Sequence, residues 1–266
     1  MKICATILFA VLVVEGNAQT RCANIDTLMK RVYKHELGSQ QWRAASDSVL
    51  NICPNSAVII YDKAVANMLR GEFVEGMKYI AKAVEIDPNY YLGISAWNHM
   101  RYLHDYKGAI ADFERLEKVA GRSFVYVTNI HMYMLKGLCY QELGDYAKAL
   151  ETYNTGISQQ VADKGEQWVG SYDYLYRGIL KFRMGDFDGA IEDLSRQVKE
   201  YESLADTYYY RGMAYAAVGR KDEARVDLQL SKDLMLGQGQ RRWDPLTVLP
   251  DEVYLTNVES ALLKLY

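Results

Sequence analysis

The chain has 266 residues, of which 50% are hydrophobic, and its 31 Lys and Arg residues nearly balance its 34 Asp and Glu residues. This composition is typical of a globular protein and unlike that of collagen, a disordered chain or a membrane bundle. A formal net charge of -3 without a long basic run gives little attraction for a phosphate backbone, so nucleic acid is not an expected partner.

The first 18 residues have the pattern of a secretory signal peptide. Lys2 precedes an apolar run over 3–14, and Ala18 closes a short segment that contains small residues. The run is shorter than the about 20 apolar residues that span a bilayer, and no later stretch reaches that length. We therefore expect cleavage after Ala18, a periplasmic or secreted location, and no membrane insertion of the mature chain.

One sequence phrase recurs in the second half of the chain. It begins with Gly137 and again with Gly178, and each glycine is followed at the same spacing by Gly-Asp, an aromatic residue and an alanine. A third copy begins with Gly212 and has Gly-Arg in place of Gly-Asp. The pattern resembles the tetratricopeptide repeat (TPR), whose unit of about 34 residues is a pair of antiparallel helices.

The resemblance implies an all-α fold, an α-solenoid that winds as a right-handed superhelix of about six TPR-like helix pairs. One pair cannot bury its apolar face alone, so neighbouring pairs stack and only the ends of the array need a cap. We expect a signal peptide over 1–18, the array over 19–238, and a connector with a C-terminal helix over 239–266. The expected units are 23–56, 57–90, 91–123, 130–163, 171–204 and 205–238.

The last expected helix carries an apolar stripe. Leu255, Val258, Leu262 and Leu265 recur at helical spacing and therefore share one face. We expect this face to cap the sixth unit. The alternative is a helix that folds back into the groove of the array or docks on another molecule.

Three cysteines remain after signal cleavage, in a compartment where disulfides persist. The repeat register puts Cys22 just before a first helix and Cys53 near the end of its partner helix. Antiparallel helices bring these two ends together, so we predict a Cys22–Cys53 disulfide. Cys139 falls inside a later helix and is expected to be a free thiol.

Two charged pairs recur at matched places in the fifth and sixth units. Arg177 and Asp193 have the same sequence separation as Arg211 and Asp227. Because the two pairs match in position, we interpret them as structural ion pairs, each worth about 0 to 1 kcal/mol if partly exposed.

The sequence contains no recognisable catalytic or metal-binding constellation. The four histidines, His35, His99, His104 and His131, are scattered, and no pair has the spacing of zinc ligands. A glycine-rich phosphate loop and a nucleophile elbow are absent from the sequence. We expect neither an enzyme nor a protein with a metal or other cofactor.

In the TPR family the inner, concave wall is lined by residues of the first helix of each unit, and the resemblance implies a matching wall here. The wall is apolar and rich in tyrosine, a residue that offers contact area and a hydroxyl group together. The family's charged clamp for a peptide carboxyl terminus is not reproduced. The implied wall residues are Tyr61, Val65, Met68, Tyr91, Ile94, Asn98, Arg101, Tyr102, His131, Met134, Leu138, Gln141, Tyr172, Leu175, Ile179, Phe182, Arg183, Tyr209 and Met213.

These features lead to two functional hypotheses. In the first, the chain is an exported TPR scaffold or adaptor that binds a protein or peptide segment, belonging to a cell-envelope or secreted partner, in its apolar groove. In the second, it is a structural or self-associating spacer whose groove is occupied by its own C-terminal helix.

Overall fold

The structure is a computed structural model that describes residues 22, 25–121, 125–128, 130–170, 172–237, 239–240 and 250–265. The expected signal peptide over 1–18 lies outside these described residues. Among the helices of the described ranges, none combines the length and the hydropathy that a bilayer span requires.

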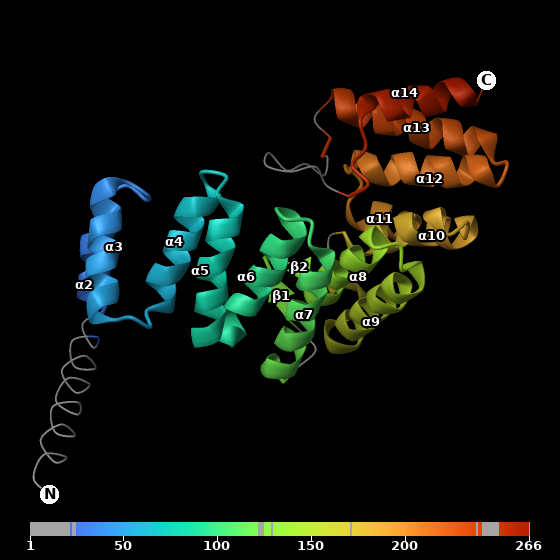
Figure 1. Cartoon of the computed structure of the whole chain (residues 1–266). Helices are drawn as coiled ribbons and strands as arrows, with labels where there is room; N and C mark the ends of the chain where they lie inside the picture. The colour runs from blue at the N-terminus through green and yellow to red at the C-terminus, as the bar shows by residue number, and fades with distance from the viewer. Residues whose placement is uncertain are drawn as a thin grey trace, which may run out of the picture. The chain divides into compact units, whose positions relative to one another are not determined.

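The described chain is helical apart from its connections and one short hairpin, so the predicted all-α fold is confirmed (Figure 1). The hairpin pairs β1 (Tyr126–Val127) with β2 (Ile130–His131) in antiparallel fashion. A 3-10 helix, η1, spans Glu166–Trp168. The α-helices are α2 (Ile25–Val32), α3 (Gln40–Ile52), α4 (Ala57–Met68), α5 (Phe73–Ile86), α6 (Pro88–Arg101), α7 (Tyr106–Ala120), α8 (Met132–Glu142), α9 (Tyr146–Lys164), α10 (Asp173–Arg183), α11 (Phe187–Glu200), α12 (Ala205–Ala217), α13 (Lys221–Leu236) and α14 (Leu255–Lys264).

The chain divides into two compact units, residues 1–95 and 96–266, with the boundary inside α6. In the first unit, α3 begins at the cap residue Ser39, whose hydroxyl accepts a hydrogen bond from the backbone N–H of Trp42. The core here is formed by Val32, Trp42, Val49, Ile59 and Ala66.

The Sγ atoms of Cys22 and Cys53 form a disulfide in the first unit, with Cα atoms 5.5 Å apart. This is the pair that the repeat register predicts, and it ties the residues before α2 to the end of α3. Cys139 lies buried within α8 and is a free thiol.

In the second unit, α8 packs against α9, α10 against α11, and α12 against α13, while the first helices α8, α10 and α12 are themselves neighbours (Figure 1). The recurring Gly-Asp explains where these helices end and begin. Gly144 and Gly185 have φ values of 77° and 82°, a left-handed conformation that suits the residue after a helix. Asp145 and Asp186 then cap α9 and α11 by accepting a hydrogen bond from a backbone N–H three residues on.

The first glycine of the repeated phrase lies where two helices of a pair approach most closely. A Cβ atom on Gly178 would lie 2.8 Å from Cγ of Leu194, and one on Gly212 would lie 2.9 Å from Cγ of Leu228. Since real Cβ contacts are longer, a side chain here would force the helices apart.

In the two matched ion pairs the carboxylate side chains are buried rather than partly exposed. The Arg177 guanidinium lies 2.6 Å from Asp193, and that of Arg211 lies 2.7 Å from Asp227. The Asp193 and Asp227 side chains are only 1% and 6% exposed, so the small value for exposed pairs does not apply. Asp193 has a second cation, because Lys181 Nζ lies 2.9 Å away.

The last helix, α14, packs on α13 and forms the expected cap. Val258 is fully buried and Ala261 nearly so, in a cluster that includes Leu228 of α13. At the edge of this contact, Lys232 Nζ lies 2.9 Å from a Glu259 carboxylate oxygen. The predicted apolar stripe therefore covers the end of the array, as the repeat architecture requires.

Candidate functional site

The candidate site is on the side of α8, α10 and α12 that contacts the short segment 250–253, which we call the first-helix face. Figure 1 shows this segment in red, running from the start of α14 back past the end of α12. Three helices contribute to the contact: α8 through Gln141, α10 through Arg183 and α12 through Tyr210. The face therefore combines residues from three successive helix pairs.

Asp251 is the centre of this contact. Gln141 Nε2 donates a hydrogen bond to Oδ2 of Asp251 at 2.6 Å, and Arg183 Nη2 forms an ion pair with Oδ1. The hydroxyl of Tyr210 donates to the backbone carbonyl of Asp251 at 3.1 Å. The Asp251 side chain is only 3% exposed. We call the three contacting residues, Gln141, Arg183 and Tyr210, the Asp251 pocket.

The pocket residues are held in place by their own repeats. The hydroxyl of the fully buried Tyr153 donates to Oε1 of Gln141 at 3.3 Å, which leaves the amide nitrogen for Asp251. Burial lowers the pKa of Arg183, but the charge and hydrogen bond of Asp251, together with Tyr146 and Glu142, raise it to above the usual value. The pKa of nearby Glu142 is raised, first by burial and then by the charge of Asp251. The arrangement thus favours one carboxylate beside a permanently charged guanidinium.

An apolar contact lies two residues further along the segment. Val253 is 2% exposed and belongs to a cluster with Leu228, Tyr209, Tyr210 and Met213. The segment therefore offers a carboxylate to one pocket and a branched apolar side chain to the next. Surfaces that bind polypeptides specifically commonly combine a charge-assisted hydrogen bond with an apolar contact from which water is excluded.

The structure brings several of the predicted wall residues to this face, namely Arg183, Tyr209, Met213 and Gln141. Other predicted wall residues are partly buried elsewhere. These are Tyr61, Val65, Met68, Ile94, Tyr102 and Tyr172. The ring of Phe182 lies 6.2 Å from that of Tyr210, so it borders the same face.

Several predicted wall residues are instead part of the core. Leu175 and Ile179 are fully buried and pack with Leu194, because α10 is enclosed by its neighbours on more than one side. Fully buried side chains offer no surface to a partner, so the structure corrects their assignment to an open wall. The buried members of the predicted set are Tyr91, Asn98, Arg101, His131, Met134, Leu138, Leu175 and Ile179, whereas Gln141, also buried, lies under Asp251 on the first-helix face.

Two residues of the pocket contact were missed from the sequence. Tyr210 is adjacent to Tyr209, which the repeat register assigns to the wall, and the register does not assign Tyr210 to it. Asp251 lies after the last repeat, in a stretch without periodicity, so no pattern marked it. Only the fold brings it next to Gln141, 110 residues earlier in the chain.

His131 illustrates how far a predicted wall residue can be removed from solvent. It is 1% exposed, stacks against Tyr133 with ring centroids 5.6 Å apart, and meets the ring of Tyr126 edge-on. Burial lowers its pKa from 6.5 to about 4, so it is neutral at physiological pH. Within the described ranges, no group of three or more His, Cys, Asp or Glu residues is placed to hold a metal ion.

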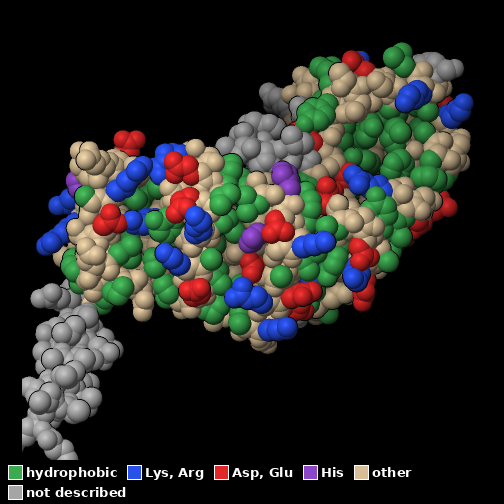
Figure 2. All heavy atoms as spheres, viewed as in Figure 1, with side chains coloured by type: hydrophobic (Ala, Val, Ile, Leu, Met, Phe, Trp, Pro, Cys, Tyr) green, Lys and Arg blue, Asp and Glu red, His purple; other side chains and the backbone are tan. Residues whose placement is uncertain are grey.

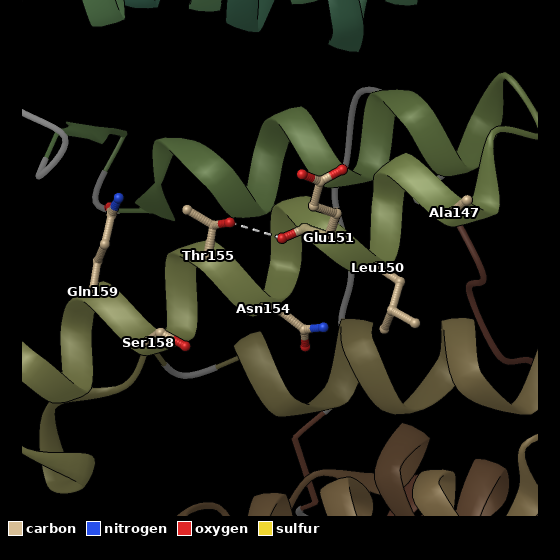
Figure 3. Close-up of a pocket in the computed structure, with 7 residues that line it drawn as sticks. All are labelled: Ala147, Leu150, Glu151, Asn154, Thr155, Ser158 and Gln159. Atoms are coloured by element: carbon tan, nitrogen blue, oxygen red, sulfur yellow. Dashed lines mark hydrogen bonds between the residues drawn. The ribbon is translucent and has the colours of Figure 1, made fainter.

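A separate open groove of about 630 Å³ runs along one face of α9 (Figure 3). Its polar groups are partly engaged: the Thr155 hydroxyl donates to the carbonyl of Glu151, and Asn154 accepts from Arg177. Its lining residues are Ala147, Leu150, Glu151, Asn154, Thr155, Ser158 and Gln159. All come from one helix, so this groove lacks the convergence of several elements that the first-helix face has.

Charge on the surface is mixed. Figure 2 shows Lys and Arg side chains interspersed with Asp and Glu over much of the face in view, and hydrophobic side chains gathered over α12 and α13. No single-sign field covers this face, which agrees with the small net charge of -3.

The helix pairs and their turns define an all-helical repeat protein of the α-solenoid class. Models of the tetratricopeptide repeat match residues 130–160 and 176–231. A TPR repeat-containing protein of Methanocaldococcus jannaschii is 23% identical over 179 residues, which cover 64% of this chain. The chain therefore contains tetratricopeptide repeats in its second half. It spans about a third of that relative, since the match covers 31% of the relative's length.

Solved structures share the fold at low sequence identity. PilW, described as a widely conserved type IV pilus biogenesis factor, is 15% identical with a TM-score of 0.58, covering 85% of this chain and 96% of its own. YrrB, described as a TPR protein with an unusual peptide-binding site, is 17% identical with a TM-score of 0.52, covering 72% of this chain and 93% of its own. At these identities the likeness is one of fold.

Proposed function

We propose that this chain is an exported TPR scaffold that acts by binding a segment of a partner protein on its first-helix face. The observation that carries the proposal is the segment 250–253, because the face already holds a non-helical polypeptide segment through a side-chain carboxylate, a backbone carbonyl and an apolar side chain. YrrB has a peptide-binding site on the same kind of fold. The signal-like N-terminus supports a partner in the cell envelope or outside the cell.

A second candidate function is a structural or self-associating spacer whose face is permanently covered by its own C-terminal segment. The contact between the buried Asp251 carboxylate and the partly exposed Arg183 guanidinium favours this candidate, since breaking it leaves the carboxylate without its cation. The two candidates differ in one respect: only the scaffold binds a foreign polypeptide.

The binding test is a selection of displayed random peptides on the mature protein, followed by fluorescence anisotropy with the peptides obtained. Phe182→Ser should weaken their binding at least about tenfold by removing apolar contact area. Val226→Ser is the matched control, because Val226 is 66% exposed on α13, a second helix. Leu175 is unsuitable for this test since it is fully buried. Failure to select any peptide, or equal binding by both variants, would reject the scaffold in favour of the spacer.

Export is tested independently. The full chain, expressed with its own N-terminus, should appear outside the cytoplasm, and its intact mass should correspond to a mature chain beginning at Gln19. An unprocessed mass in the cytoplasmic fraction would contradict export and leave the binding proposal standing.

A further inference from the structure

Segment 250–253 occupies the first-helix face in the manner of a bound ligand. Its carboxylate pairs with Arg183 and accepts from Gln141, its backbone accepts from Tyr210, and its next buried side chain, Val253, enters an apolar cluster. Through these contacts the face recognises one acidic side chain, the backbone carbonyl of the same residue, and an apolar side chain two positions later. They are distributed over three repeats, whereas an ordinary repeat contacts only its neighbours.

The segment pays a conformational cost for this placement. Asp251 has a φ of 58°, in the left-handed region that few residues other than glycine adopt, although Asp tolerates it better than most. The pocket contacts stabilise this backbone conformation, and its energetic cost weakens the hold of the pocket on the segment.

The pocket does not depend on the segment for its own construction. Gln141 is held by Tyr153, and each of Gln141, Arg183 and Tyr210 belongs to a different repeat helix with its own packing. An empty pocket would leave the buried amide donor of Gln141 without its acceptor and would remove the ion-pair partner of Arg183, which is unfavourable. The pocket is therefore complementary to a carboxylate in any polypeptide that reaches it.

We propose that the Asp251 pocket is the recognition site for a partner segment with an acidic residue followed two positions later by an apolar one, and that residues 250–253 are an internal competitor which that partner displaces. This inference rests on the proposed scaffold function. The internal competitor has a high effective concentration because it is part of the same chain. A partner can bind only while the pocket is empty, so its apparent affinity is its intrinsic affinity multiplied by the fraction of molecules with an empty pocket.

The test uses the full mature chain and a fluorescent peptide with the sequence of residues 248–256. Asp251→Lys places a second cation beside Arg183 and should empty the pocket, whereas α14 keeps its apolar contacts with α13. Glu252→Lys is the matched control, because it makes the same change of charge at the neighbouring position. Circular dichroism establishes that both variants are folded, and Asp251→Asn, which removes the charge with little change of size, serves as a second variant.

We expect Asp251→Lys to bind the peptide at least about tenfold more tightly than the wild type and Glu252→Lys, with Asp251→Asn in between. Adding Arg183→Gln to Asp251→Lys should abolish the gain, and a peptide with Asn in place of its Asp should bind at least about tenfold more weakly. Equal binding by all chains, no binding by Asp251→Lys, or indifference to Arg183→Gln would overturn the proposal. If peptides selected at random still bind and still depend on Phe182, only this inference fails; if none binds, the proposed function fails as well.

Discussion

The matched ion pairs allow a sharp prediction, because among the described residues Asp193 has a second cation and Asp227 does not. In Arg211→Met, Asp227 keeps a 6% exposed carboxylate without its bidentate partner, which we expect to cost about 3 kcal/mol of unfolding free energy, the lower end for a broken buried pair. In Arg177→Met, Asp193 retains Lys181 at 2.9 Å, so the expected cost is about 1 to 2 kcal/mol.

The measurement is urea unfolding followed by far-UV circular dichroism, with free energies from linear extrapolation. Arg177→Met combined with Lys181→Met should lose about 3 kcal/mol, matching Arg211→Met, because Asp193 then lacks both cations. Lys148→Met is the control; its ion pair with Asp145 is exposed, so this substitution should leave the free energy of unfolding almost unchanged. Equal losses in the two single arginine variants, or a loss below about 1 kcal/mol in Arg211→Met, would refute the role assigned to Lys181 and to burial.

Three further outcomes follow from the fold. Replacing Cys22 and Cys53 together by serine opens a loop of sequence separation 31 and should cost about 3 to 4 kcal/mol in urea unfolding, whereas an unchanged midpoint would show that the bridge does not form. The pKa of His131 falls from 6.5 in the unfolded chain to about 4 in the folded chain, so its contribution to the free energy of unfolding is full above pH 6.5 and is lost as the pH falls towards 4. His131→Phe should remove about 2 to 3 kcal/mol of this loss of stability in acid, and identical stability profiles of the two proteins against pH would contradict the prediction. Gly137→Ala puts a methyl group against the ring of Tyr153 and should destabilise by about 1 to 3 kcal/mol despite the better helix propensity of alanine, with a gain in thermal midpoint as the opposing result.

The repeated phrase was sufficient to predict the helix pairs because each of its residues has a local structural role. The left-handed glycine at position 144 ends α8, and Asp145 begins α9 by capping it, so the sequence itself encodes the turn. Gly178 and Gly212 lie where the two helices of a pair are too close for a side chain, so they too have a local structural role. Such determinants lie within one repeat, and a periodic sequence displays them several times.

The burial of individual side chains and the contacts between distant parts of the chain could not be predicted from the repeated phrase. The TPR register assigns Leu175 and Phe182 to the same wall, but the first is fully buried and the second is only partly so, because burial depends on the neighbouring repeats rather than on position in the unit. The site centred on Asp251 joins residues far apart in the chain, and a single sequence carries no periodic signal for such a contact. The hypothesis of a self-occupied groove named the C-terminal helix, but the segment just before that helix makes the contact, while α14 itself serves as the cap.

The contacts of residues 251–253 affect the stability of the repeat array. Stability in a repeat array is carried mainly by contacts between successive units, so α8 and α12 are normally coupled only through α10. Residues 251–253 contact all three helices, and they therefore add a direct link between units that are not adjacent. A polypeptide that displaces the segment must restore this link with contacts of its own, or the three helix pairs lose part of their mutual stabilisation. The face is thus expected to favour partners that reach from Gln141 to the Val253 cluster over shorter ones that satisfy Arg183 alone.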